Sequence, residues 1–167
     1  MLPENAIMEI ENTTGYVFQN KHLLTQAFTR SSYHNEHRES QHNEVLEFYG
    51  DAVLNLAVTD ILLEQYSYWR GDEMCPVKRE GKLSNLRDFL VNNPYLSLKT
   101  INLGLQKHLR CGNGDQFHSL DILADLFEAL LGAIFLDSGK DIRIARDIVY
   151  RLLDVDAFLP IKSDNIS

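Results

Sequence analysis

HNEVLEFYGDAVLNLAV, residues His42 to Val58, is the most informative stretch of the chain. Its acidic residues Glu44, Glu47 and Asp51 are separated by three and then by four positions. This spacing places the three carboxylates on one side of an α-helix, although most of the residues between and after them are apolar. A helix that is apolar nearly all round is normally buried, and carboxylates are rarely buried without a partner. The stretch therefore predicts a packed helix with an acidic stripe.

A second apolar stretch, LDILADLFEALLGAIFLDSG from Leu120 to Gly139, carries its own acidic pair, Asp125 and Glu128. If the two helices pack together, their carboxylates converge, and ionised carboxylates in one pocket raise each other's pKa. Neither stretch contains Lys or Arg. A divalent cation would neutralise such a cluster, and carboxylate oxygens favour Mg²⁺ or Mn²⁺ over zinc. The alternative is an ordinary solvated acidic face on each helix, and the pattern alone leaves both open.

The remainder of the sequence predicts helices and no strand of useful length, so the fold class is all-α. The expected helices cover residues 21–30, 43–66, 81–93, 94–104, 120–139 and 141–153. Asn20 is expected to cap the first of them and Gly104 to end the fourth. Segments 31–42 and 67–80 are expected to be loops, the second a loop or short insertion, and 111–115 a turn. We expect a single domain over residues 1–160 and a frayed tail over 161–167.

The bulk composition limits the class of protein. The 167 residues are 44% hydrophobic, with a net charge of −8, which argues against a generic, basic nucleic-acid binder. Cys75 and Cys111 fit neither a disulfide framework nor a zinc site. No apolar run approaches the roughly 20 residues that cross a bilayer, and the N-terminus lacks the pattern of a signal peptide. We therefore expect a cytoplasmic, intracellular protein with no membrane partner.

Taken together, the two acidic stretches resemble the ribonuclease III family. Residues 43–51 match a signature of the form N-E-x-L-E-F-x-G-D, and residues 125–129 match a D-x-x-E-A motif. The resemblance runs from about Gly15 to Leu153. It implies a single helical endonuclease domain that hydrolyses phosphodiester bonds of double-stranded RNA. It also implies a homodimer with one metal-dependent site per subunit, using Mg²⁺ or Mn²⁺ and no small-molecule cofactor.

The resemblance assigns roles residue by residue. The implied metal ligands are Glu47, Asp51, Asp125 and Glu128. Within this set, the implied catalytic residues are Asp51 and Glu128. Glu44 and Glu80 correspond to an outer set of acids that contacts a second metal ion or the substrate. Phe48 falls where relatives place an aromatic side chain that packs into a socket on the partner subunit.

Basic residues lie on both sides of Glu80 in the sequence. They are Lys78, Arg79, Lys82 and Arg87. We expect them to bind RNA at the rim of the site, because A-form RNA is recognised through its backbone, its 2′-hydroxyls and its shape. The alternative is again an ordinary solvated face.

The sequence also departs from the family pattern. Arg30 follows Thr29 where relatives often carry His, and the segment from Tyr66 to Lys78 looks longer than in compact bacterial members. No double-stranded-RNA-binding domain follows residue 153, so we expect it to be either naturally absent or removed. Two other functions stay open: a catalytically weak or inactive domain serving as an RNA-binding or assembly scaffold, and a metal-binding domain that acts on another phosphodiester. The presence of all six acids favours the enzyme.

Overall fold

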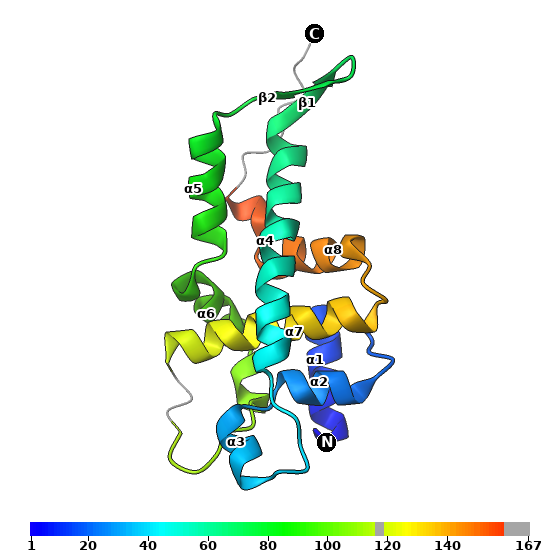
Figure 1. Cartoon of the computed structure of the whole chain (residues 1–167), viewed down its shortest axis with the longest axis vertical. Coiled ribbons are helices and arrows are strands. Elements are labelled where there is room, and N and C mark those ends of the chain that lie inside the picture. Colours follow the sequence, from blue (N-terminus) through cyan, green and yellow to red (C-terminus); the bar gives the residue numbers. More distant parts are fainter. Residues whose placement is uncertain (116–118, 159–167) are drawn as a thin grey trace.

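The computed structural model describes residues 1–115 and 119–158, and the fold over this part is all-α with one small β-hairpin (Figure 1). The longer helices are α1 (Glu4–Thr14), α2 (Lys21–Ala27), α3 (Ser31–Glu36), α4 (Glu44–Tyr66), α5 (Glu80–Leu90), α6 (Asn93–Asn102), α7 (Leu120–Asp137) and α8 (Ile142–Leu152). The short elements are the strands β1 (Ser67–Arg70) and β2 (Glu73–Pro76) and the 3-10 helices η1 (Leu105–His108) and η2 (Val155–Ala157). The predicted domain end at residue 160 and the tail 161–167 lie outside the described residues.

Helices α4 and α7 form the centre of the fold, and α7 crosses the first half of α4 (Figure 1). Their contact is apolar, and Leu54 and Ala57 of α4 and Leu126 and Leu130 of α7 are buried. Burial of apolar side chains is the main stabilising contribution in such a core. Among the described residues, no helix is long and apolar enough to span a membrane.

Helices α6 and α8 pack against this central pair. The hydroxyl of Thr100 in α6 donates to the carbonyl oxygen of Leu123 in α7 at 2.9 Å. Helix α8 is amphipathic, with Ala145, Ile148, Val149 and Leu152 buried. Its Arg146 forms ion pairs with Asp60 and Glu64 of α4. Helix α6 therefore packs on α7, and α8 packs on both α4 and α7.

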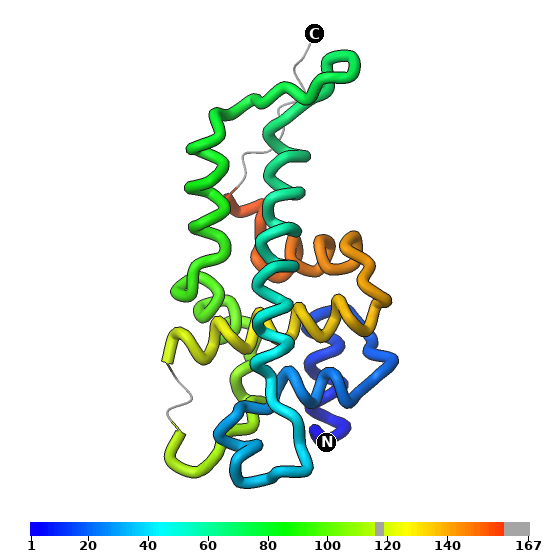
Figure 2. Tube along the Cα trace, in the orientation of Figure 1, coloured from blue at the N-terminus to red at the C-terminus, as the bar shows by residue number. Residues whose placement is uncertain are grey.

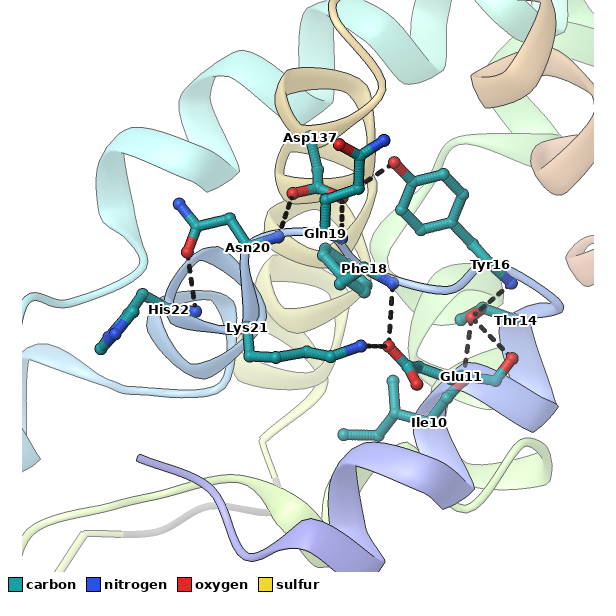
Figure 3. A network of polar contacts seen from close by, with 10 residues as sticks. All are labelled: Ile10, Glu11, Thr14, Tyr16, Phe18, Gln19, Asn20, Lys21, His22 and Asp137. Carbon is teal, nitrogen blue, oxygen red and sulfur yellow. Dashed lines mark hydrogen bonds and ion pairs between the residues drawn. The ribbon is translucent and has the colours of Figure 1, made fainter.

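The N-terminal segment is attached to the end of α7 by Asp137 (Figure 3). This carboxylate accepts hydrogen bonds from the backbone N–H groups of Gln19 and Asn20, both at 2.8 Å, and from the hydroxyl of Tyr16 at 2.9 Å. Glu11 of α1 accepts from the N–H of Phe18 and pairs with Lys21 (Figure 3). Helix α1 was not anticipated from the sequence, although it buries Ala6, Ile7 and Ile10.

Most of the predicted helices are confirmed. The side chain of Asn20 caps α2, as predicted, by accepting from the N–H of His22 at 3.0 Å. Gly104 follows α6 in the left-handed conformation, at φ 69°, as expected for a glycine at a helix end. Helix α2 ends at Ala27 rather than at residue 30, because the backbone N–H of Arg30 bonds to Arg110 instead of continuing the helix.

The prediction of a loop over 31–42 is wrong in its first half, where α3 forms. This polar helix is stabilised by contacts with residues distant in sequence. Glu36 accepts from the backbone and side chain of Asn113, at 2.7 and 3.0 Å. The Arg110 guanidinium lies over the Tyr33 ring at 4.1 Å. A helix held by such contacts leaves no amphipathic pattern in its own sequence.

Segment 67–80 was predicted to be a loop or short insertion, and the loop is wrong for residues 67–76, where β1 and β2 pair as an antiparallel hairpin. A two-residue turn joins them, with Gly71 at φ 61°, a conformation that suits hairpin turns. Figure 2 shows the hairpin projecting beyond the end of α4. Because both faces of the hairpin are largely exposed, the strands show no alternation of apolar and polar residues.

Candidate metal centre

Two glycines set the distance between α4 and α7. A Cβ atom on Gly50 would overlap the backbone carbonyl of Glu128, and one on Gly132 would overlap the backbone carbonyl of Leu46. The two helix backbones are therefore in direct contact at this crossing. Side chains within one turn of each glycine are brought together as a result.

Three carboxylates meet beside this contact. Glu47 of α4 and Asp125 and Glu128 of α7 each offer an oxygen, and these oxygens lie within 4.8 Å of one another. All three side chains are partly buried. A half-buried group of three carboxylate oxygens suits a hard divalent cation such as Mg²⁺ or Mn²⁺.

The carboxylates of the cluster have raised pKa values. Burial, followed by the charges of Asp51, Asp125 and Glu47, raises the pKa of Glu128 to about 8. Burial, with the charge of Asp125 next in size, raises the pKa of Glu47 to about 7. Burial also raises the pKa of Asp125. In the metal-free protein this cluster therefore retains protons near neutral pH, and a bound cation would have to displace them.

Asp51 and Glu44 lie at the edge of the cluster. Asp51 is exposed, and one of its oxygens accepts from the Asn55 side-chain amide at 2.9 Å. Its negative charge nevertheless contributes to the raised pKa of both Glu47 and Glu128, so it lies close to them. Glu44, whose side chain is 60% exposed, lies 3.7 Å from the Nδ1 atom of His42.

Glu80 is separate from the cluster within one chain. It begins α5, accepts from the Ser84 hydroxyl at 2.7 Å, and lines a groove between α4 and α5 of about 200 Å³. The other residues of this α4–α5 groove are Thr59, Leu62, Leu63, Leu83, Ser84 and Arg87. At 1.5 Å per residue, Thr59 lies about 18 Å beyond Glu47 along α4, so the groove and the carboxylate cluster are at different ends of this helix.

The four basic residues predicted to bind RNA lie in or near α5, in two hollows. Lys78, Arg79 and Lys82, together with Val77, line a hollow of about 310 Å³. The Lys78 ammonium lies over the Tyr66 ring, 4.6 Å from its centroid. Arg87 lines the α4–α5 groove and pairs with Asp88 at 3.3 Å. The structure thus brings three of the four predicted residues together in one hollow, and the fourth, Arg87, lines the α4–α5 groove instead.

Phe48 lies on the solvent-exposed face of α4, with 82% of its surface exposed. Val45 and Leu56, at 69% and 56%, and the exposed Ala52 occupy the same face. Residues spaced by three, four and four positions form one stripe along a helix. An exposed apolar stripe of this length is a candidate contact surface.

Arg30 is a neighbour of the cluster that sequence reasoning missed. Its Nε atom lies 2.9 Å from a carboxylate oxygen of Asp115, and the two side chains are only 22% and 15% exposed. Burial raises the pKa of Glu47 and Asp125, and the positive charge of Arg30 partly offsets this by lowering both pKa values. The available signal was that an arginine stands at position 30, where the family pattern often has histidine. Its partner Asp115 lies 85 positions further along the chain and could not be identified from the sequence.

The chain is similar to known proteins over most of its length. A family described as Ribonuclease-III-like matches residues 20–154. The chain is 36% identical to Ribonuclease 3 of Treponema succinifaciens over 151 residues, which are 88% of this chain and 41% of that protein. It is also 36% identical to Ribonuclease 3 of Aquifex aeolicus over 158 residues, which are 95% and 65% of the two chains. The chain therefore spans only two-fifths to two-thirds of the length of these relatives.

A solved structure has a similar fold. It is the nuclease domain of ribonuclease III from Campylobacter jejuni, described for the structural flexibility of a region involved in dimer formation. The two structures superpose with a TM-score of 0.74 and 32% sequence identity, covering 90% of this chain and 97% of that one. The likeness thus extends across the helices that carry the carboxylates.

Proposed function

This chain belongs to the ribonuclease III family, and on that basis we propose that it is a metal-dependent endoribonuclease that hydrolyses phosphodiester bonds in double-stranded RNA. The observation that carries the proposal is the convergence of Glu47, Asp125 and Glu128 at the glycine contact between α4 and α7. Repelling carboxylates are retained in a partly buried site only where something compensates for them.

The cation proposed for this cluster is Mg²⁺, with Mn²⁺ as a substitute. When bound, a divalent ion stabilises the charge that develops on the phosphate and lowers the pKa of bound water. Glu47, Asp125 and Glu128 would hold it, and Asp51 would complete the set from the solvent side. The carboxylate ligands would also fix where the scissile phosphate rests.

Asp51 and Glu128 are the residues to which we assign the catalytic roles. Asp51 is exposed next to the cluster, so RNA could reach its carboxylate from the solvent side. Burial, followed by the charges of the neighbouring acids, raises the pKa of Glu128 to about 8, which reflects its place inside the cluster. Such perturbed groups are typical of catalytic sites.

The active form that we propose is a homodimer in which the α4 helices of the two copies lie antiparallel. Phe48 is near the start of α4 and the apolar α4–α5 groove is near its end. In a two-fold symmetric pair, each copy can insert its Phe48 into the partner's groove at the same time. The symmetry axis then passes near Asn55, midway between Phe48 and the groove residue Leu62.

The same arrangement gives Glu80 a role. Since the groove of one copy meets the Phe48 of the other, the partner's Glu80 approaches Glu44 and Asp51. We therefore propose that Glu44 and Glu80 form an outer acidic set, shared between the two copies, for a second metal ion or for the substrate. Lys78, Arg79, Lys82 and Arg87 would border it and contact RNA phosphates, whose binding is salt-dependent.

The test is an incubation of the purified chain with end-labelled duplex RNA, with and without Mg²⁺ or Mn²⁺. Single-stranded RNA and duplex DNA of the same sequence serve as control substrates. We expect cleavage only of duplex RNA and only with a divalent cation. Binding of duplex RNA without cleavage, under every metal condition, would favour the scaffold function instead. The free state of Cys75 and Cys111 fits the reducing cytoplasm, where we place this activity.

A further inference from the structure

The β1–β2 hairpin is an apolar surface that nothing else in the described chain covers. Trp69 and Met74 pair across the strands on one face of the hairpin and are 66% and 48% exposed. Tyr68 lies on the opposite face and is 47% exposed, and Val77, just after β2, is 65% exposed. The hairpin continues past the end of α4, away from the other helices (Figure 1). An isolated two-stranded hairpin is marginally stable in water, and exposed apolar patches mark interaction sites.

We propose that this hairpin docks on a second copy of the chain, against the first turn of the partner's α4 and the segment 37–43 that precedes it. The proposal rests on the homodimer proposed above, because the antiparallel pairing of the α4 helices fixes what the hairpin meets. With the axis near Asn55, residue 66 of one copy lies opposite residue 44 of the other, and residue 67 lies opposite residue 43.

The dimensions of the elements agree with this contact. Helix α4 has 23 residues and is about 34 Å long, so each end lies about 17 Å from the axis. A four-residue strand adds about 13 Å beyond the helix end. In each copy, α3 and segment 37–43 lie at the other end of α4 from the hairpin (Figure 1). The hairpin of one copy therefore extends over this segment of the other.

The charges of the two surfaces are complementary. The chain leaving the hairpin carries Lys78, Arg79 and Lys82, which share one hollow. The surface opposite carries the exposed acids Glu39 and Glu44, with Glu47 one turn further along, and one exposed base, Arg38. The hairpin itself adds the Arg70–Glu73 ion pair and the exposed Asp72. Opposite charges of this kind orient two surfaces and exclude wrong pairings.

The apolar side chains favour a protein partner over RNA. Val45, 69% exposed in the first turn of α4, offers an apolar contact for the partner's hairpin. In a duplex the bases are stacked, and aromatic side chains recognise RNA mainly where bases are splayed out. Trp69 and Met74 would therefore find little to pack on along an intact duplex.

Trp69 is the only tryptophan of the chain, so tryptophan emission, excited at a wavelength that tyrosine does not absorb, reports on the hairpin alone. The experiment records the emission maximum of the full chain over a concentration series, with sedimentation velocity on the same samples. We expect a blue shift as the dimer forms, with the same midpoint in both measurements. Phe48→Ala should move the midpoint of both measurements to a concentration about thirtyfold higher or more, and below it the emission should stay at the long wavelength of exposed tryptophan.

A matched pair of methionine variants tests the energetics. Met74→Ser should weaken dimerisation roughly fivefold, because it removes an apolar contact on the hairpin. Met8→Ser alters a methionine of α1 that is similarly exposed, at 58%, and should leave dimerisation unchanged.

Three outcomes would overturn the proposal, and they are distinguishable. A dimer by sedimentation whose Trp69 emission does not shift, with Met74→Ser neutral, removes the hairpin contact but leaves the homodimer intact. A monomer at every concentration removes both the contact and the homodimer. An emission change that occurs only on addition of duplex RNA shows that the hairpin binds RNA rather than a second copy.

Discussion

Among the single side chains, Glu128 projects from the middle of α7 into the carboxylate cluster. Glu128→Gln keeps its shape and removes its charge, and a neutral amide is a poor ligand for Mg²⁺. We predict that cleavage of duplex RNA falls by about a hundredfold or more, as is common when electrostatic stabilisation is lost. Duplex RNA binding should persist, because the basic residues are unaffected. Gel-shift and cleavage assays on one preparation check both, and Glu4→Gln, an exposed acid of α1, is the control.

The raised pKa of Glu128 also predicts how stability depends on pH. A carboxyl whose pKa is about 8 in the folded chain and near 4.5 when unfolded binds its proton more tightly in the folded state. Its ionisation therefore costs stability progressively as pH rises from about 4.5 through 8. We predict that, in metal-free buffer, Glu128→Gln melts at a higher temperature than the parent at pH 9 and at the same temperature at pH 4.5. Equal melting curves at pH 9 would show that folding does not raise the pKa of the Glu128 carboxyl.

Arg30 is the positive charge already present beside the cluster. Arg30→Gln leaves Asp115 without its ion pair and removes the charge that lowers the pKa of Glu47 and Asp125. We predict a lower melting temperature without metal, and a larger increase on adding Mg²⁺ than the parent shows, since the cation then replaces the lost charge. Differential scanning calorimetry with and without Mg²⁺ measures this, with the exposed Arg38→Gln as the control. An identical Mg²⁺ response in parent and Arg30→Gln would contradict it.

At the scale of the helices, the contact between Gly50 and Gly132 fixes the site. Gly50→Ala places a methyl group against the Glu128 carbonyl, and neither backbone can yield without moving a buried helix. We predict a loss of about 3 kcal/mol or more in the free energy of unfolding, as in severe overpacking. Gly81→Ala in α5 is the matched control, because its added Cβ meets nothing within 4 Å. Urea titration of the two variants gives the comparison, and a native-like Gly50→Ala would show that the helices can separate there.

The helices that could be predicted from sequence are those that carry their own signals. Asn20 caps α2 and Gly104 follows α6, and the apolar runs of α4 and α7 require burial. Helix α3 and the hairpin could not be predicted. The first depends on Glu36 and Tyr33 meeting residues 110–113, and the second is exposed on both faces. Local patterns cannot record such distant contacts.

The carboxylate cluster was one of two interpretations that the sequence left open. Glu47, Asp125 and Glu128 lie on two apolar helices that were expected to pack, and the structure brings their oxygens together. The distance of Glu80 from this cluster could not be predicted from the sequence, because it depends on the length of α4 and on where α5 packs against it. Metal binding by Glu47, Asp125 and Glu128 is a proposal.

For the molecule as a whole, the exposed stripe on α4 predicts self-association. Phe48→Ala removes the most exposed large side chain of that stripe. If Phe48 fills the partner's groove, its loss should weaken the dimer by about thirtyfold or more, the range of a buried aromatic anchor. Sedimentation equilibrium measures the dissociation constant. Val17→Ala, at a residue 71% exposed outside this stripe, is the control, and equal effects of the two changes would rule out the anchor.

The glycine contact also limits how the metal preference of this protein could be redesigned. Since the two backbones touch, the distance between α4 and α7 cannot be tuned by exchanging core side chains for larger or smaller ones. The remaining variable is the reach of each carboxylate from a fixed main chain. An engineer who wants a wider coordination sphere, suited to a larger ion, would therefore shorten Glu47 or Glu128 to aspartate, and would lengthen Asp125 to glutamate for a tighter one.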